Sequence, residues 1–187
     1  ANKQVSFGKL FVKTGVIFGL IASVFVAFPS GDWNAKNVVK YQPATFAAME
    51  GLFKTEDAGS EIVLIGQPNM IEQKLDNKIA VPNMLSFLTY HNWSEEIKGL
   101  DSFDKDTWPT SIPALYYSYH IMVGLGTLFI GLMALAVFLL WRKKLFDTKA
   151  VLWALLFAVP FPYLANLSGW YTAELGRQPW LVYNLLK

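Results

Sequence analysis

Three apolar segments, each long enough to cross a lipid bilayer, constrain this chain more than any other feature of its sequence. They lie near residues 9–28, 112–141 and 148–175. A bilayer core about 30 Å thick requires about 20 apolar residues in a helix, and each segment meets that length. Burying all three in a water-soluble core would leave too little polar chain to cover them. The sequence therefore predicts an all-α membrane protein with three transmembrane helices.

The composition agrees with a membrane location. Charged residues make up 16% of the chain, whereas soluble domains carry about a quarter. The formal net charge of +2 and the lack of any motif for binding DNA or RNA argue against nucleic acid as a partner. The sequence has no cysteine, which excludes disulfides and thiolate metal sites. The expected surroundings are therefore membrane lipid.

Basic and acidic residues are distributed unevenly, and this predicts an orientation. Residues 30–112 hold twelve acidic residues and seven lysines, whereas the remainder holds nine basic and two acidic residues. Because positively charged flanks stay in the cytoplasm, the basic residues before the first segment and in the turn after Trp141 predict a cytoplasmic N-terminus. The chain thus divides into a first transmembrane helix at 1–29, an extracytoplasmic loop at 30–111, and the second and third transmembrane helices at 112–187.

The 30–111 loop is too rich in apolar and aromatic residues to be a simple linker. It contains the apolar runs EIVLIG at 61–66 and VPNMLSFL at 81–88. Residues 40–53 have a composition suited to a helix, with Pro43 where a first helical turn tolerates proline. Loops beyond about 15 residues are usually functional or disordered. The composition of this loop predicts a folded, functional segment.

Glu174 is the acidic residue that lies near the end of the third apolar segment, in GWYTAELGRQPW. An ionisable residue at membrane depth is costly and is a functional candidate by default. At helical spacing, Trp170, Glu174 and Arg177 share one face. The residues alone leave two readings open: a functional carboxylate, or an ion pair that anchors a helix end.

Met122 and His120 are the other candidates for chemistry within the apolar segments. Met122 lies roughly 14 Å from the nearer end of the second segment, at 1.5 Å per residue. A lone methionine in an apolar helix is usually a packing residue. His120 lies about 200° round the helix from Met122, so the two side chains cannot address the same point. A histidine there is a haem ligand, a proton carrier or a hydrogen-bonded interior residue.

Glu50, in QPATFAAMEGLF, belongs to the expected helix of the loop. A carboxylate in that position either acts as a general base at the membrane surface or belongs to a solvated helix face. From the residues alone, the solvated face is the favoured interpretation.

Three stretches in this order resemble the catalytic subunit I of cytochrome bd-type quinol oxidases. They are GDWNAKNVVKYQPATFAAMEGLF, PALYYSYHIMVGLG and GWYTAELGRQPW, which together cover about a quarter of the chain. The spacing of the apolar segments between them also fits this family. The resemblance implies a prokaryotic cytoplasmic membrane protein that oxidises quinol and passes electrons through haems b to a haem that reduces dioxygen to water.

The resemblance also implies roles for individual residues. Met122 corresponds to an axial ligand of the low-spin haem b, and Glu174 to a ligand of the high-spin haem b. Trp170 would lie between the high-spin haem b and the third haem, which is haem d or another haem b. Arg177 would lie near haem propionates. Glu50 would belong to the quinol-binding loop. If Glu174 is a ligand, we expect its carboxylate to point into the bundle and away from Arg177.

The sequence departs from the family pattern at several positions. Thr45 and His120 stand where many members have lysine and arginine, and both changes bear on quinol contacts. The family's earlier helices, which carry the histidine ligands of the haems, have no counterpart here, and neither His91 nor His120 replaces them. The resemblance therefore implies part of a larger helical bundle, completed by other membrane subunits or by preceding helices.

Besides a catalytic role, two other functions are compatible with a chain that crosses the membrane three times. A bd-like subunit that has lost its haems would serve as a non-catalytic membrane scaffold, and the sequence leaves this reading open. A transporter is disfavoured, because the sequence has neither an internal repeat nor the interrupted apolar segments typical of transporters.

Overall fold

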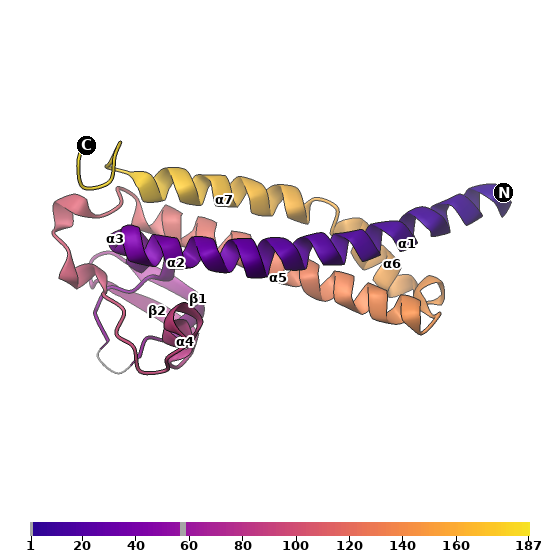
Figure 1. Ribbon diagram of the computed structural model, residues 1–187, viewed down its shortest axis with the longest axis horizontal. Helices are drawn as coiled ribbons and strands as arrows, with labels where there is room; N and C mark the ends of the chain where they lie inside the picture. Colours follow the sequence, from indigo (N-terminus) through magenta and orange to yellow (C-terminus); the bar gives the residue numbers. More distant parts are fainter. Residues whose placement is uncertain (1, 57–58) are drawn as a thin grey trace. The chain divides into compact units, whose positions relative to one another are not determined.

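The structure is a computed structural model that describes residues 2–56 and 59–187 (Figure 1). Within these residues, three helical stretches are long and apolar enough to cross a membrane: Lys3–Tyr41, Ile112–Trp141 and Lys149–Arg177. The predicted membrane protein with three spans is thereby confirmed. The second stretch is the uninterrupted helix α5, Ile112–Trp141, whereas the first and third differ from their expected form.

The first helical stretch runs further than its apolar segment. Helix α1, Asn2–Phe25, passes through a π-helical turn at Val26–Gly31 into α2, Asp32–Tyr41. Pro29 lies inside the π-helical turn. Because proline lacks an N–H and its ring crowds the preceding turn, a wider turn accommodates it without ending the helix. The sequence predicted an end near residue 28 because the apolar pattern stops there, but the helical backbone continues.

The third helical stretch is broken where a single run was expected. Helix α6, Lys149–Phe157, and helix α7, Phe161–Arg177, are separated by a turn at 158–160. Pro160 ends this turn and has no N–H to continue the hydrogen bonding of α6. The break makes α7 a separate helix, and α7 is the helix that carries Glu174.

The chain forms two compact units. The first takes in the chain up to Asp32 together with Val123–Asn166. Its core consists of Val16, Met133, Ala136 and Leu145, with partly buried apolar residues around them. Helix α1 and helix α5 approach closely at Gly19, where an added Cβ would lie 3.2 Å from the Met133 sulfur. This unit holds mainly apolar membrane helix.

The second unit, Trp33–Met122 with Leu167–Lys187, holds the folded loop and the adjoining ends of α5 and α7. Besides helix α3, Pro43–Glu50, it contains helix α4, Met84–Tyr90. Pro43 occupies the first turn of α3, as its position in the sequence predicted. Leu115 of α5 belongs to the same buried cluster as the middle of α3. The core of this unit is Val39, Phe46, Ala47, Ala48, Leu52, Phe53, Leu85, Ile97, Leu100, Ile112 and Leu115.

The loop also contains an antiparallel hairpin, which the sequence reading did not predict. Strand β1, Ile62–Asn69, pairs with strand β2, Lys74–Val81, and the register is irregular in β1. The pairing begins at Asn69 and Lys74, next to the turn, and ends at Ile62 and Val81. Helix α4 follows β2 directly, so the hairpin and α4 lie together in the second unit (Figure 1).

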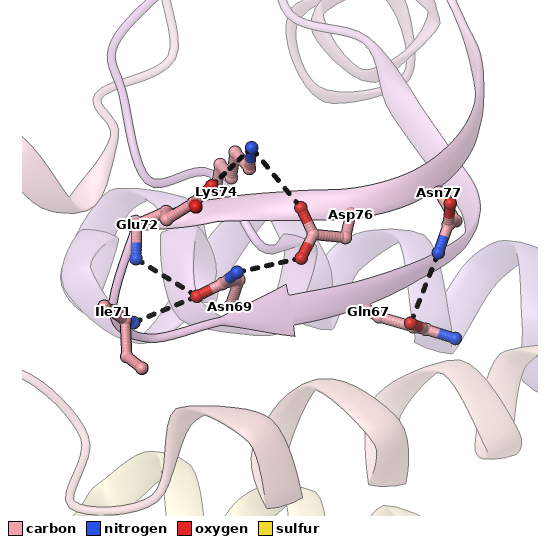
Figure 2. Close-up of polar contacts among 7 residues, drawn as sticks. All are labelled: Gln67, Asn69, Ile71, Glu72, Lys74, Asp76 and Asn77. Carbon is pink, nitrogen blue, oxygen red and sulfur yellow. Dashed lines mark hydrogen bonds and ion pairs between the residues drawn. The ribbon is translucent and has the colours of Figure 1, made fainter.

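Polar side chains close the hairpin turn (Figure 2). The Asn69 side-chain oxygen accepts hydrogen bonds from the backbone N–H groups of Ile71 and Glu72, both at 3.1 Å. Its amide nitrogen donates to Asp76 at 2.9 Å. Lys74 forms ion pairs with Glu72 and, at 3.6 Å, with Asp76. Asn69 thus organises the turn locally, as asparagine commonly does in tight turns.

Candidate functional site

Glu50 is a buried carboxylate at the end of α3. Only 2% of the residue is exposed, so the solvated face favoured from the residues alone is wrong. The reason is that α3 is covered on all sides: five of the residues before Glu50 are also buried, which a helix with a solvated face would not allow. Its sequence, PATFAAME, has no polar face opposite an apolar one. A helix of this kind is expected to be buried on all sides.

Gly51 fixes the position of Glu50 by ending α3 in a tight turn. Its φ is +71°, in the left-handed region that side chains with a Cβ adopt at a cost. An added Cβ would lie 2.9 Å from a methyl carbon of Leu75 on β2 and 3.0 Å from the Tyr116 ring on α5. The backbone conformation and the close packing therefore both require glycine. The end of α3 is held between the hairpin and α5.

The polar neighbours of Glu50 are tyrosines of α5. The Tyr119 side chain is the polar group whose interaction lowers the pKa of the Glu50 carboxyl. Tyr116, three residues earlier on the same helix face, is buried, and its hydroxyl has no hydrogen-bond partner among the residues described. Neither tyrosine is among the site residues predicted from the sequence. The available signal was the run YYSYH, a cluster of polar aromatic side chains inside an apolar segment.

Burial shifts the titration of Glu50 toward neutral pH. Desolvation raises the pKa of this carboxyl from its ordinary value of 4.5 to about 7, and the interaction with Tyr119 offsets part of that rise. A carboxyl whose pKa lies near the working pH both accepts and releases protons, as a general base must. Strongly shifted groups of this kind concentrate at functional sites.

His120 joins the second span to the hairpin. Its Nδ1 lies 2.9 Å from the backbone oxygen of Tyr116, and its Nε2 lies 3.0 Å from that of Val63 on β1. Its ring stacks on the Tyr116 ring with centroids 3.9 Å apart. Of the three readings open for His120, the structure shows the hydrogen-bonded interior residue. His91, the other histidine, caps the end of α4 and lies 3.3 Å from the Lys36 amine.

Thr45 connects the helix that carries Glu50 to the helix that carries Glu174. Its buried hydroxyl donates to the backbone oxygen of Gly176 at 2.8 Å. An added Cβ at Gly176 would lie 2.7 Å from the Thr45 methyl carbon. Where many members of the resembled family have a lysine, this chain therefore has a direct contact between α3 and α7.

Trp170, Glu174 and Arg177 lie along one face of α7, as their spacing predicted. The Arg177 guanidinium donates to the Glu174 carboxylate at 2.5 Å, and the two side chains are 52% and 41% exposed. The expected direction of the carboxylate, away from Arg177, is therefore not what the structure shows. The three-residue spacing brings the two groups together within one helical turn. Trp170 is also exposed and contacts Tyr171. A haem-ligand role for Glu174 stays a prediction.

Met122 packs against α7. An added Cβ at Gly169 would lie 2.7 Å from the Met122 sulfur, so the absence of a side chain at Gly169 makes room for it. This contact is the packing arrangement usual for methionine, and ligation by Met122 stays a prediction.

Met122 and Glu174 each have a side chain that could provide one ligand of a haem iron. A thioether and a carboxylate are both axial ligands that proteins offer to haem iron or other metals. Among the described residues, no group of three or more His, Cys, Asp or Glu could hold a metal ion by itself. On α7, an exposed tryptophan and an exposed guanidinium suit a flat apolar group that carries carboxylates.

Comparison with known proteins agrees with the family resemblance seen in the sequence. Residues 1–187 match the family model described as cytochrome bd terminal oxidase subunit I. The chain is similar to the cytochrome bd ubiquinol oxidase subunit 1 of Bacillus subtilis (strain 168), with 32% identity over 193 residues, 99% of this chain and 41% of the relative. It is also similar to the cytochrome bd-II ubiquinol oxidase subunit 1 of Escherichia coli (strain K12), with 22% identity, 92% of this chain and 46% of the relative.

A solved structure shares the fold. The bd oxidase from Geobacillus thermodenitrificans superimposes with a TM-score of 0.74 and 27% identity, covering 95% of this chain and 39% of that one. The chain therefore spans less than half the length of the relatives it matches.

Proposed function

Because this chain belongs to the cytochrome bd terminal oxidase subunit I family, we propose that it forms part of a membrane enzyme that oxidises quinol and reduces dioxygen to water. The observation that carries the proposal is the buried Glu50 carboxyl, 2% exposed, with a pKa of about 7. A group that titrates near neutral pH in a dry, structured loop is the feature that a proton-accepting quinol site needs.

In the proposed reaction, quinol gives up two protons and two electrons and becomes quinone. Four electrons and four protons convert one dioxygen to two waters, so two quinols are consumed for each dioxygen. Glu50 accepts a proton from a quinol hydroxyl. With a pKa of about 7, a large share of this carboxyl is anionic at neutral pH and ready to accept, and it releases the proton again without a large barrier.

The residues of the second and third helical stretches would hold haem. Met122 and Glu174 would each supply a ligand, with Arg177 near the propionates and Trp170 beside the haem. When bound, haems b and a third haem, either d or b, supply electron transfer and dioxygen reduction. Because Arg177 is paired with Glu174 in this chain, its guanidinium would have to contact both Glu174 and the propionates. Other membrane subunits or further helices would supply the histidine ligands.

The charge distribution supports an orientation for this site. We infer a cytoplasmic N-terminus and an extracytoplasmic loop at 30–111, which would place the Glu50 proton on the extracytoplasmic side. Accessibility of the loop to added protease checks this orientation. In spheroplasts, cleavage of the loop from outside supports it, whereas cleavage only in inverted vesicles contradicts it.

The substitution Glu50→Gln in the assembled oxidase tests the quinol role. Glutamine keeps the shape of the side chain but cannot accept the proton, so quinol-driven oxygen consumption should fall by about 100-fold. Haem spectra should not change, and oxygen consumption driven by tetramethyl-p-phenylenediamine, an electron donor that bypasses quinol, should remain. Glu96→Gln, an exposed carboxyl of the same loop, is the matched control. Equal loss with both electron donors would contradict the proposal.

A non-catalytic scaffold is the second candidate. The observation that favours it is that both expected haem ligands are engaged within the chain: Met122 packs on Gly169, and Glu174 pairs with Arg177. Visible spectra of the purified membrane complex separate the two functions. Haem b and haem d bands support the oxidase, and a complex free of haem supports the scaffold.

A further inference from the structure

The beginning of α6, next to the turn that joins it to α5, carries a groove on one helix face (Figure 1). The groove has a volume of about 240 Å³ and is lined by Lys149, Leu152, Trp153 and Leu156. The spacing of these residues places them in a single stripe along the helix. Pockets that enclose a whole small molecule start at about 300 Å³. This groove therefore accommodates part of a ligand, with a cation at one end and apolar side chains along the rest.

The core of the first unit holds the groove in place. Leu145, in the turn before α6, is fully buried, and Leu152 packs against the same cluster. The Thr148 hydroxyl donates a hydrogen bond to the backbone oxygen of Lys144 at 3.0 Å, which closes the turn. Trp153, by contrast, is 59% exposed. The groove is thus backed by packed side chains and opens away from the core.

The turn before the groove is strongly basic. Residues 142–149, RKKLFDTK, hold four basic residues and one acid, Asp147, which gives a net charge of +3. Within the part of the chain that the structure describes, none of these four basic side chains forms an ion pair. Helix α1 adds a further cation, because the Lys9 amine lies 5.3 Å from the centre of the Phe146 ring. The groove therefore begins beside positive charge that the described residues do not neutralise.

We propose that this groove binds one anionic phospholipid, from the membrane leaflet on the side of the basic turn. The lipid phosphate pairs with the Lys149 amine, and an acyl chain follows the leucines of the stripe. Trp153 lies about 6 Å further along the helix than Lys149, at 1.5 Å per residue, which suits an indole at the boundary between headgroups and chains. The helical stretch that contains the groove is long and apolar enough to cross a membrane. None of the residues proposed above to act on quinol or haem belongs to this site.

The composition of the stripe selects this class of ligand over simpler ones. A free phosphate ion gains nothing from the apolar part of the groove, and a lipid without net charge gains little from the basic turn. A phospholipid with a net negative charge uses both. Each basic residue near a membrane surface contributes about fivefold in affinity for anionic lipid. We therefore expect both the charge of Lys149 and the open groove below it to matter.

Native mass spectrometry of the assembled oxidase, delipidated in a neutral detergent, measures this binding. Dioleoyl phosphatidylglycerol and dioleoyl phosphatidylcholine are titrated separately. We expect the first phosphatidylglycerol to bind about fivefold or more tightly than phosphatidylcholine. Lys149→Gln should weaken that first binding event about fivefold. Leu156→Trp keeps the charge but fills the groove, so it should weaken binding as well. Lys98→Gln, at an exposed lysine of the loop, is the control and should leave binding unchanged.

Each contrary outcome overturns the proposal for a different reason. Equal affinity for the two lipids would show that charge does not select the ligand, as would equal binding by Lys149→Gln and Lys98→Gln. Unchanged binding in Leu156→Trp would place the lipid outside the groove. Binding of neither lipid would mean that protein of the assembled complex covers the groove.

Two further measurements complete the test. Inorganic phosphate added to the lipid-bound oxidase should not displace the lipid, and displacement would show a phosphate site that makes no use of acyl chains. Should Lys149→Gln fail to assemble, raising ammonium acetate to about 1 M replaces it, because salt screens exposed charges. The preference for phosphatidylglycerol should then disappear, and a preference that persists would overturn the proposal.

Discussion

The ends of α3 and α7 each carry a glutamate, and their surroundings differ in every respect that matters for chemistry. Glu50 is buried, has a phenol as its polar partner and titrates at about pH 7. Glu174 is 41% exposed and is paired with a guanidinium on its own helix. A carboxyl without a cation in a dry site is suited to accept protons, whereas an ion-paired carboxylate on an exposed face is suited to electrostatic or ligand contacts.

The difference follows from what covers each helix end. Helix α3 is packed on one side by α5 and at its end by the hairpin, so its glutamate is almost fully buried. Helix α7 carries Trp170 and Arg177 beside Glu174, and all three side chains are exposed in this chain. The haem that we propose for this helix would cover apolar and charged groups together.

The largest expected effect concerns the exposed carboxylate. If Glu174 is the ligand of the high-spin haem b, Glu174→Ala should remove that haem's signal from visible spectra, and Glu174→Asp should weaken it because the side chain is too short. Glu96→Ala, an exposed acid of the loop, is the control. Full haem content and full activity in Glu174→Ala would mean that the carboxylate only pairs with Arg177, and the scaffold function would gain support.

A second experiment asks whether α7 packing or haem binding explains Met122. Leucine has a similar volume and preserves the contact with Gly169, but it lacks the sulfur. Met122→Leu should therefore lower the potential of the low-spin haem b or convert it to high spin, as measured by redox titration and visible spectra. Met133→Leu is a matched control, since its sulfur also packs against a glycine of a neighbouring helix. Unchanged spectra and quinol reduction would leave Met122 as a packing residue.

Gly51 offers a sharper test of how Glu50 is held. Gly51→Ala places a Cβ at φ +71° and into contact with Leu75 and Tyr116, which should cost about 2 kcal/mol or more of stability. Thermal unfolding of the purified complex and quinol oxidation should both suffer. Gly124→Ala, on α5 with no heavy atom within 4 Å of the added Cβ, is the control. An unchanged melting temperature would show that the turn is more tolerant than its geometry indicates.

The smallest expected effect concerns the contact between the two helices. Thr45→Val keeps the shape of the side chain but removes the hydroxyl that donates to Gly176, leaving a buried carbonyl without that donor. The cost should be about 1–3 kcal/mol of stability, measured by thermal unfolding. Thr45→Ser, which keeps the hydroxyl, should recover most of the loss. If valine and serine behave alike, the hydrogen bond contributes nothing and packing alone joins α3 to α7.

Features that depend on local sequence were predictable. Hydropathy located the three spans, Pro43 marked the start of α3, and the spacing of Glu174 and Arg177 placed them on one face. The resemblance of GRQPW and AAMEG to family stretches led to the family that the comparisons show.

Features that depend on contacts between distant segments were not predictable. The burial of Glu50 arises because residues of the hairpin and of α5, far away in the sequence, close over it. The hairpin itself has an irregular register, which weakens the alternating pattern by which strands are recognised. The spacing along α7 allows the Glu174 carboxylate to point toward Arg177 or away from it. The structure shows it paired with Arg177.

A titration of the Glu50 carboxyl in the assembled oxidase tests most directly whether this group can accept the quinol proton. Infrared difference spectra across a range of pH, with Glu50→Gln used to assign the band, measure its protonation without turnover. We expect a midpoint at about pH 7, because the burial of Glu50 outweighs the opposing effect of Tyr119. A midpoint near the ordinary value of 4.5 would show that the carboxyl is solvated, and Glu50 would no longer be a credible proton acceptor for quinol.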